Sequence, residues 1–182
     1  MNGRKVKHAR STKQTKNYNV KNYTSKRRSG IQRYKKWQAP GAPFRCAQCR
    51  HLICLSDGIG TLHRNHCPFC LWSLHVDTKT GNRASSCHGR MEPVGLTFKH
   101  NGFDKYDRPR VGDVMLVHFC KACGTININR IAGDDCTDRI FSVFGNQQRL
   151  ASSVTRKIGE MGICLMGAKD VERLNVAILG RS

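Results

Sequence analysis

The stretch Arg64-Asn65-His66-Cys67-Pro68-Phe69-Cys70 decides the fold expected for this chain. Cys67 and Cys70 form a C-x2-C pair, and an earlier pair, Cys46 and Cys49, completes the pattern C-x2-C-x17-C-x2-C. This spacing is typical of a structural zinc site, in which two tight turns each present two thiolates to one tetrahedral ion. We therefore predict that these four cysteines bind one Zn²⁺.

A third C-x2-C pair, Cys120 and Cys123, follows an apolar run at 114–117. Cys87 adds one more thiolate, so a second tetrahedral site needs one further ligand. His118 lies two residues before Cys120, and side chains two residues apart on a strand point to the same side. We predict a second zinc site made by Cys87, His118, Cys120 and Cys123, with His88 and Asp135 as the alternative fourth ligands.

The residues around these cysteines resemble the bacterial RNHCP domain family, and the resemblance covers residues 44–136. The segments that carry it are Arg64 to Cys70, Cys70 to Asp77, Cys87 to Pro93, His118 to Gly124 and Asn129 to Asp135. The family is zinc-ribbon-like, so the resemblance implies a zinc-binding fold and no defined activity. Thr80-Gly81-Asn82-Arg83 stands where the family usually has Pro-Gly-Asp-Arg.

Residues 1–43 form the predicted tail and hinge. Residues 1–40 hold 13 Lys or Arg and no acid, and their few aliphatic residues cannot offset the entropy of ordering a core. We expect this tail to be disordered alone and to bind RNA, with its aromatic rings stacking on exposed bases. The predicted contacts are Arg4, Lys5, Lys7, Arg10, Lys13, Lys16, Tyr18, Lys21, Tyr23, Lys26, Arg27, Arg28, Arg33, Tyr34, Lys35, Lys36 and Trp37, with Arg64 and Arg130 added from the zinc domain.

The whole chain of 182 residues carries 32 Lys and Arg against 12 Asp and Glu, a net charge of +20 that favours a polyanionic partner. Met1 leads into polar residues without the apolar core of a secretory signal, and no apolar run approaches the length of a membrane span. We therefore expect a soluble, cytoplasmic, ribosome-bound protein. Its expected partners are structured RNA, above all ribosomal RNA, and neighbouring ribosomal proteins, with no membrane.

Beyond residue 137 the apolar residues recur at helical spacing, which predicts helices over the C-terminal extension, 137–182. Gly145-Asn146 is expected to separate a short helix from a longer one, and Asp170 is expected to cap a last amphipathic helix. Cys54, Cys136 and Cys164 are predicted to be buried thiols outside the metal sites.

The predicted fold is a small α+β zinc-binding domain, of zinc-ribbon or treble-clef type with two zinc knuckle sites, between a disordered basic tail and C-terminal helices. The predicted function is RNA binding, and the alternatives are a DNA-binding regulator or a zinc-dependent hydrolase that acts on nucleic acid. We expect no enzyme, because acids are scarce and the H-E-x-x-H and H-x-E motifs are missing. As an alternative to contacting RNA, Arg130 is expected to form an internal ion pair with Asp134 or Asp135.

Overall fold

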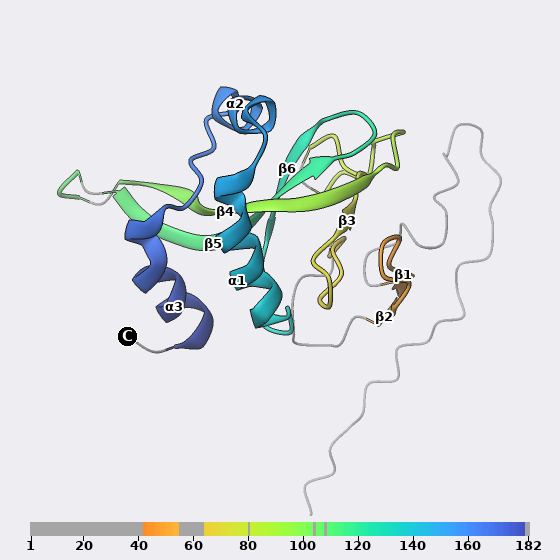
Figure 1. Ribbon diagram of the computed structural model, residues 1–182, viewed down its shortest axis with the longest axis horizontal. Helices are drawn as coiled ribbons and strands as arrows, with labels where there is room; N and C mark the ends of the chain where they lie inside the picture. Colours follow the sequence, from red (N-terminus) through yellow and green to blue (C-terminus); the bar gives the residue numbers. More distant parts are fainter. Residues whose placement is uncertain (1–41, 55–63, 80, 104, 108, 181–182) are drawn as a thin grey trace, which may run out of the picture. The chain divides into compact units, whose positions relative to one another are not determined.

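The structure, a computed structural model, describes residues 42–54, 64–79, 81–103, 105–107 and 109–180. All predicted RNA contacts of the tail lie outside these residues. The described part holds two antiparallel sheets, one of two strands and one of four (Figure 1). The strands are β1 (Phe44–Arg45), β2 (Leu52–Ile53), β3 (Ser73–Leu74), β4 (Arg90–Phe103), β5 (Pro109–Cys120) and β6 (Ile126–Arg130).

The four-stranded sheet is a meander in which β3, β4, β5 and β6 pair in chain order. Its main part is the β4–β5 hairpin, where Met91 pairs with Cys120 at one end and Phe103 with Pro109 at the other. The first of three register shifts along this hairpin lies between Pro93 and Gly95. The pairing brings the start of β4, just after Cys87, beside the end of β5, where Cys120 begins a turn.

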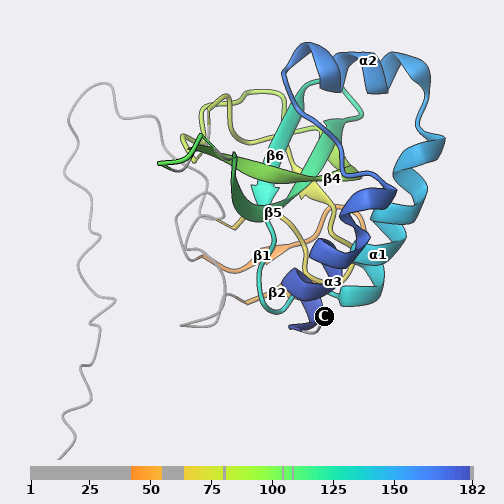
Figure 2. The ribbon, with the colours of Figure 1, turned by 90° about the vertical axis from the view of Figure 1, so that its left-hand side faces the viewer.

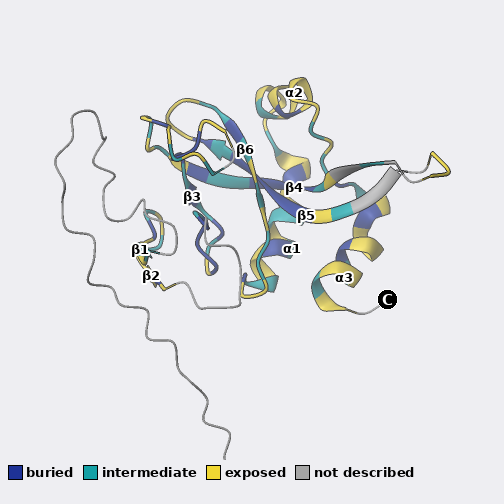
Figure 3. Cartoon of the chain, turned by 180° about the vertical axis from the view of Figure 1, so that it is seen from behind, coloured by how far each residue is buried: buried dark blue, intermediate teal, exposed yellow. Residues whose placement is uncertain are grey.

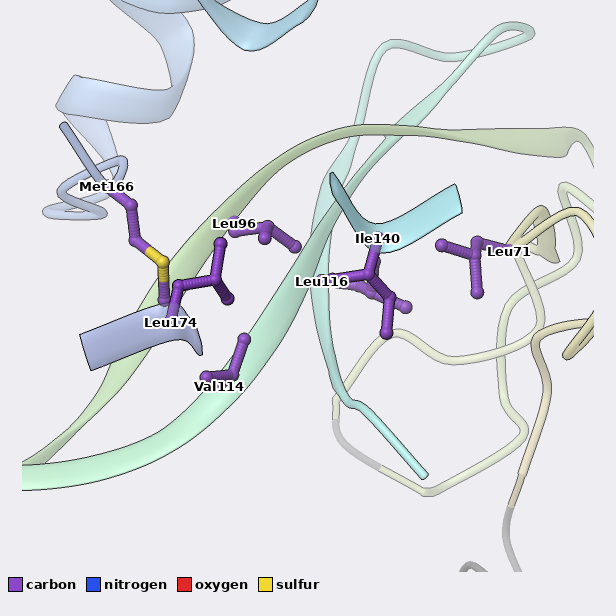
Figure 4. Close-up of a cluster of buried hydrophobic side chains, with 7 residues drawn as sticks. All are labelled: Leu71, Leu96, Val114, Leu116, Ile140, Met166 and Leu174. Carbon is purple, nitrogen blue, oxygen red and sulfur yellow. The ribbon is translucent and has the colours of Figure 1, made fainter. Parts of the chain in front are cut away.

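The run Val114-Met115-Leu116-Val117 on β5 is buried at every position, because both faces of the hairpin are covered. Val114 and Leu116 face a cluster completed by β4, two helices and the segment before the last helix (Figure 4). Val117, on the opposite face, belongs to a second cluster. The buried members of the first cluster are Leu71, Leu96, Val114, Leu116, Ile140, Met166 and Leu174, and those of the second are Val94, Val117, Ile126 and Ile158.

Three α-helices supply the rest of this core. They are α1 (Thr137–Asn146), α2 (Ser152–Glu160) and α3 (Val171–Leu179), with short 3-10 turns η2 (Gln147–Arg149) and η3 (Ala168–Asp170). Helices α1 and α3 contribute to the first cluster and α2 to the second (Figure 2). Their outward sides are exposed, as an amphipathic pattern predicts (Figure 3).

The helical extension predicted from the sequence is present, and Asp170 occupies the N-cap position of α3. The expectation of a longer second helix is wrong, because α1 has 10 residues and α2 has 9. The chain between them forms η2, whose Gln147 side chain is buried. Gln147 accepts a hydrogen bond from the Leu96 N–H at 3.0 Å and donates one to the Met166 carbonyl at 2.7 Å, so it fixes the sheet to the segment that precedes α3.

Candidate metal centres

Three C-x2-C turns share one hydrogen-bonding pattern, and each presents two thiols. In the first, the Cys46 N–H donates to the His51 carbonyl at 2.9 Å, and the Arg50 N–H donates to the Cys46 carbonyl at 3.1 Å. Cys67 and Cys120 repeat both bonds at the same sequence offsets. We call these turns knuckles 1, 2 and 3, for residues 46–51, 67–72 and 120–125. The common pattern means that each knuckle offers its pair of sulfur atoms in the same way.

The residue after the second cysteine of each knuckle lies in the left-handed backbone region. Its φ is 67° at Arg50, 61° at Leu71 and 71° at Gly124. Glycine adopts this conformation without a steric cost, whereas an L-residue with a side chain costs about 1–2 kcal/mol there. The chain therefore accepts backbone strain at Arg50 and Leu71 in order to close the first two knuckles.

The first candidate metal centre combines knuckles 1 and 2. The sulfur atoms of Cys46 and Cys70 lie 3.6 Å apart, and those of Cys49 and Cys67 lie 3.5 Å apart. A tetrahedral Zn²⁺ with Zn–S bonds of about 2.3 Å requires sulfur atoms about 3.8 Å apart. All four ligand atoms lie within 4.8 Å of one another, so the predicted set Cys46, Cys49, Cys67 and Cys70 can hold one metal ion.

The second candidate centre combines knuckle 3 with Cys87 and with a histidine that the sequence reading missed. The Cys87 and Cys120 sulfur atoms lie 3.7 Å apart, and the Cys123 sulfur lies 3.2 Å from Nδ1 of His75. These four ligand atoms also lie within 4.8 Å of one another. Gly89 is needed at this point, since a Cβ there would come within 2.8 Å of the Cys120 sulfur. The cluster can hold a second metal ion through three thiols and His75.

The prediction that His118 is the fourth ligand is wrong. Its Nε2 donates to the Leu71 carbonyl at 2.7 Å, and its Nδ1 accepts from the Asn129 amide at 3.0 Å. Because a carbonyl oxygen can only accept, Nε2 carries the proton and the ring is neutral. The side chain is fully buried, and this burial lowers the pKa of His118 to about 4 against the raising effect of the bond to Leu71. His118 is therefore a core residue with both ring nitrogens in use.

The two alternative ligands do not join the cluster either. His88 adopts a φ of 51°, and its backbone N–H donates to the His75 carbonyl, but its side chain is not among the clustered ligands. Asp135 is also outside the cluster, and its carboxylate accepts from His66 at 2.9 Å and from the Ala132 N–H at 2.8 Å. Both residues shape the chain near a metal centre without offering a ligand atom to it.

The thiols of the first centre differ in acidity when no cation is present. Burial opposes ionisation of Cys49, but hydrogen bonds from the backbone and side chain of His51 outweigh it and lower the pKa to about 6. Burial raises the pKa of Cys67 to about 11 and that of Cys70 well above its usual range. A divalent cation removes this conflict, because a metal ion deprotonates the thiols that coordinate it.

A buried ionic network joins knuckle 2 to the segment before α1. Nη1 of Arg64 donates to both oxygens of Asp134, at 2.6 and 2.7 Å, and Nη2 donates to Asp135. His66 donates to the other side of Asp135, and the Pro68 carbonyl accepts from the N–H of the residue that caps α1. The arginine, the histidine and the second aspartate of this network are all buried, which holds the knuckle in a fixed place against the helix.

Two sequence-based assignments change as a result. Arg64 was predicted to contact RNA, but its side chain is 2% exposed and both terminal nitrogens are paired. Arg130 was offered as the internal partner of Asp134 or Asp135, whereas it pairs with Asp113 at 2.8 Å. Arg130 is half exposed, so it remains open to a contact with RNA.

In the neighbouring loop, from Asp77 to Ala84, a carboxylate and an amide side chain accept hydrogen bonds that fix the backbone. The Asn65 amide donates to Asp77 at 3.2 Å, and the Arg83 N–H donates to the other oxygen of Asp77 at 2.7 Å. Oδ1 of Asn82 accepts from the backbone N–H groups of Thr78 and Ala84. An aspartate carboxylate accepts such bonds equally well, so Asn82 can replace the aspartate usual at this position in the family.

The remaining cysteines are less buried than predicted. Cys54 and Cys164 are exposed and Cys136 is half buried. The expectation of buried thiols is therefore wrong for Cys54 and Cys164. None of the three takes part in either metal cluster.

The two metal centres and the network around them lie within one recognisable family domain. The RNHCP domain matches residues 41–141 of the chain. The chain belongs to the RNHCP domain family. No curated protein and no solved structure matched it. Among the described residues of this RNHCP protein, no helix has both the length and the apolar character to span a membrane.

Of the residues that spell the name of the family, Arg64, Asn65 and His66 make the internal hydrogen bonds described above, and Cys67 is a candidate metal ligand. His75 was missed although it lies inside a segment that carries the family resemblance. The alternation in the sequence points the other way: Trp72, Leu74 and Val76 are apolar, which predicts that Ser73 and His75 face outward. The structure instead buries Ser73 and His75 and leaves Trp72 and Leu74 half buried. The available signal was residue type alone, a histidine five positions after Cys70 that could serve as a zinc ligand.

Proposed function

We propose that this RNHCP protein binds structured RNA as a cytoplasmic ribosomal or ribosome-associated protein, with Zn²⁺ in both centres. The observation that carries the proposal is the segment 1–40, with 13 basic residues and no acid, which leads directly into knuckle 1. Each basic residue that meets a phosphate releases a counterion, and this release is the main source of affinity for RNA. The acid-free composition means that no carboxylate of the segment competes with phosphate.

The exposed surface of knuckle 1 supports the same proposal. Arg45, Arg50 and His51 are exposed there, and so is the ring of Phe69 from knuckle 2, at 54%. The His51 and Phe69 rings lie 4.8 Å apart, centroid to centroid. Cationic and aromatic side chains together suit RNA, whose phosphates and unstacked bases they can contact.

Zinc is the metal that the two ligand sets fit best. Four thiols, or three thiols and an imidazole, in a tetrahedral arrangement are typical of structural zinc sites, and iron is the main competitor for such ligands. Neither set keeps a water-bearing position, because each has four protein ligands. A bound Zn²⁺ would hold two knuckles together in the first centre and would join β3, the start of β4 and knuckle 3 in the second.

We propose binding rather than catalysis. A hydrolase needs an acid or base near the metal, and His66 and Asp135 are residues of the right type. They are only 3% and 7% exposed, they are bonded to each other, and Asp135 also accepts from Arg64. A general base must reach the proton that it removes. Side chains that are buried and paired in this way serve the internal network instead.

The test is sedimentation of the tagged full chain from a cell lysate through sucrose gradients of rising salt, with metal counted in the same fractions. We expect the protein to co-migrate with ribosomal particles and to carry two zinc ions per chain. The fraction of protein released from the particles should increase as the salt concentration rises. Migration as a free small protein at every salt concentration would overturn the proposal. Co-migration that DNase abolishes and RNase leaves intact would favour DNA as the partner.

A charge-matched pair of variants tests the role of the tail. Replacing Lys26, Arg27 and Arg28 with glutamine should lower the affinity for ribosomal RNA and reduce the salt slope by about 2–3. The control replaces three exposed basic residues of the C-terminal region, Arg149, Arg156 and Lys157, and changes the net charge equally. Equal losses in the two variants would mean that total charge, and not the tail, determines binding.

A further inference from the structure

A cleft of about 280 Å³ lies beside the first metal centre, between knuckle 1 and β3. Its walls are mostly apolar, and none of its lining residues is acidic. The residues that line it include Phe44, Arg45, Asn65, Trp72, Leu74 and Val76. Ligand pockets usually measure about 300–1,000 Å³, so this cleft suits one ring system rather than a whole nucleotide.

The cleft offers polar groups as well as rings. Trp72 is half buried, and no described residue accepts a hydrogen bond from its indole N–H. The Asn65 amide nitrogen donates to Asp77, and no described residue donates to its Oδ1. Arg45 is exposed, its Nη1 donates to the Arg50 carbonyl at 2.8 Å, and no described carboxylate neutralises its charge. An aromatic wall, one donor, one acceptor and a cation are thus available at one place.

In the sequence, the segment proposed to bind phosphate comes shortly before the residues that line this cleft. Its last basic residue, Lys36, is eight positions before Phe44, which lines the cleft together with Arg45. An RNA strand held by the end of the tail is therefore tethered to the chain a short distance in sequence from the cleft. Tethering raises the effective concentration of its bases there.

We propose that this cleft binds one unpaired base of a single-stranded RNA segment, with the base against Trp72 and Phe44 and with the adjacent phosphate at Arg45. The proposal rests on the proposed RNA-binding function and assigns the base-reading part of it to knuckle 1. A planar ring fills an apolar slot of this size, and its edge can donate to Oδ1 of Asn65 while its face lies against the Trp72 ring. The basic tail then supplies affinity, and the cleft supplies the preference for exposed bases over duplex.

The first test uses the unaltered, metal-loaded full chain and short fluorescein-labelled single-stranded RNAs. In each RNA one nucleotide in turn is abasic, so a base is lost while every phosphate is kept. We expect binding to fall about tenfold when the abasic site meets the cleft, the size typical for one stacked base. An even, negligible effect at all positions, with salt-dependent binding retained, would overturn the cleft and leave the tail-based function standing. If no RNA binds at all, both proposals fail.

The second test compares two ring-to-leucine variants of the same chain. Trp72→Leu removes the ring from the cleft, whereas Tyr106→Leu removes an exposed ring in the β4–β5 turn, outside the cleft. Both variants must keep two metal ions, counted by native mass spectrometry. We expect Trp72→Leu to bind intact RNA about tenfold more weakly than the parent, and to show no further loss when the RNA lacks the base that meets the cleft. Tyr106→Leu should bind both RNAs as the parent does. Equal behaviour of the two variants would overturn the proposal.

A third measurement leaves the lining of the cleft unaltered, since it uses substitutions in the tail only, and it also detects a competing occupant of the cleft. The indole N–H resonance of Trp72, assigned by comparison with Trp37→Phe, should shift when single-stranded RNA is added and stay unchanged with duplex RNA. A shift caused by Tyr34→Ala or Trp37→Phe without RNA, and none on adding RNA, would mean that the chain's own tail fills the cleft. That result would overturn base binding at this site.

Discussion

Two histidines near the second cysteine cluster have opposite roles, and their surroundings explain why. Nδ1 of His75 lies 3.2 Å from the Cys123 sulfur, whereas both ring nitrogens of His118 are used by Leu71 and Asn129. His118 cannot serve as a ligand because both of its ring nitrogens are bonded to core partners. The fourth ligand comes from a neighbouring segment, and His75 supplies it.

The same substitution at both histidines tests this assignment. His75→Gln should reduce the metal content from two ions to one, because the second centre loses a ligand. His118→Gln should retain both ions. Native mass spectrometry of the two variants, prepared with equal zinc, measures the count. One ion in the His118 variant and two in the His75 variant would contradict the structure.

His118 also makes stability depend on pH. Its pKa in the folded state, about 4, lies below the ordinary 6.5, so the unfolded chain binds the extra proton first. The free energy of unfolding should therefore fall as the pH drops from 6.5 towards 4, by about 2 kcal/mol between pH 7 and pH 5. Urea titrations of the parent and of His118→Gln, with metal counted at each pH, measure the part of this pH dependence that His118 contributes. The variant should lack that part, and an identical pH dependence in both proteins would refute the assignment.

At the scale of elements, knuckle 2 is attached to the sheet and helices by side chains rather than by apolar packing alone. Asp135 accepts from Arg64, His66 and Ala132, and it lies just before α1. The sequence predicted the three C-x2-C turns, the apolar β5 and the helical extension, because these depend on local spacing. It did not predict the pairing of Arg64 with Asp134 and Asp135, since the partners are about 70 residues apart and only the fold brings them together.

Removal of the buried carboxylate charge should loosen this attachment. Asp135→Asn should cost about 3–5 kcal/mol of unfolding free energy, because the buried Arg64 loses part of its compensation. Asp134→Asn is the matched control: its side chain is 37% exposed, so water can replace part of the lost bond and the cost should be smaller. Urea denaturation of both variants measures the difference. Equal costs would show that burial of Asp135 is unimportant.

At the scale of the whole molecule, the core is unevenly distributed. The clusters around β4, β5 and the helices contain 11 buried residues, and the cluster at knuckles 1 and 2 contains Cys46, Ile53 and Cys67. Two of these last three, Cys46 and Cys67, are candidate metal ligands. The sequence could indicate both metal centres and the helices, but not that the helices cover both faces of one hairpin, because that depends on which apolar residues meet.

Metal removal should therefore affect the two ends of the molecule differently. After treatment with a strong chelator, residues 44–54 and 64–76 should lose protection from hydrogen exchange, because little apolar burial remains there without the ion. The β4–β5 hairpin and α1 should keep much of theirs. Hydrogen-exchange mass spectrometry of the loaded and stripped protein measures both regions. Uniform loss of protection would mean that the metal centres and the core unfold together.

The placement of the ligands along the chain also sets an order of assembly during synthesis. Cys46 and Cys70 of the first centre are separated by 24 positions, and His75 and Cys123 of the second by 48. Because translation proceeds from the N-terminus, the first centre has all its ligands when knuckle 3 has not yet been made. The nascent chain can therefore acquire its first ion early. His75 follows the first centre closely in the sequence, but the second centre is complete only after the β4–β5 hairpin has been made and brings in Cys120 and Cys123.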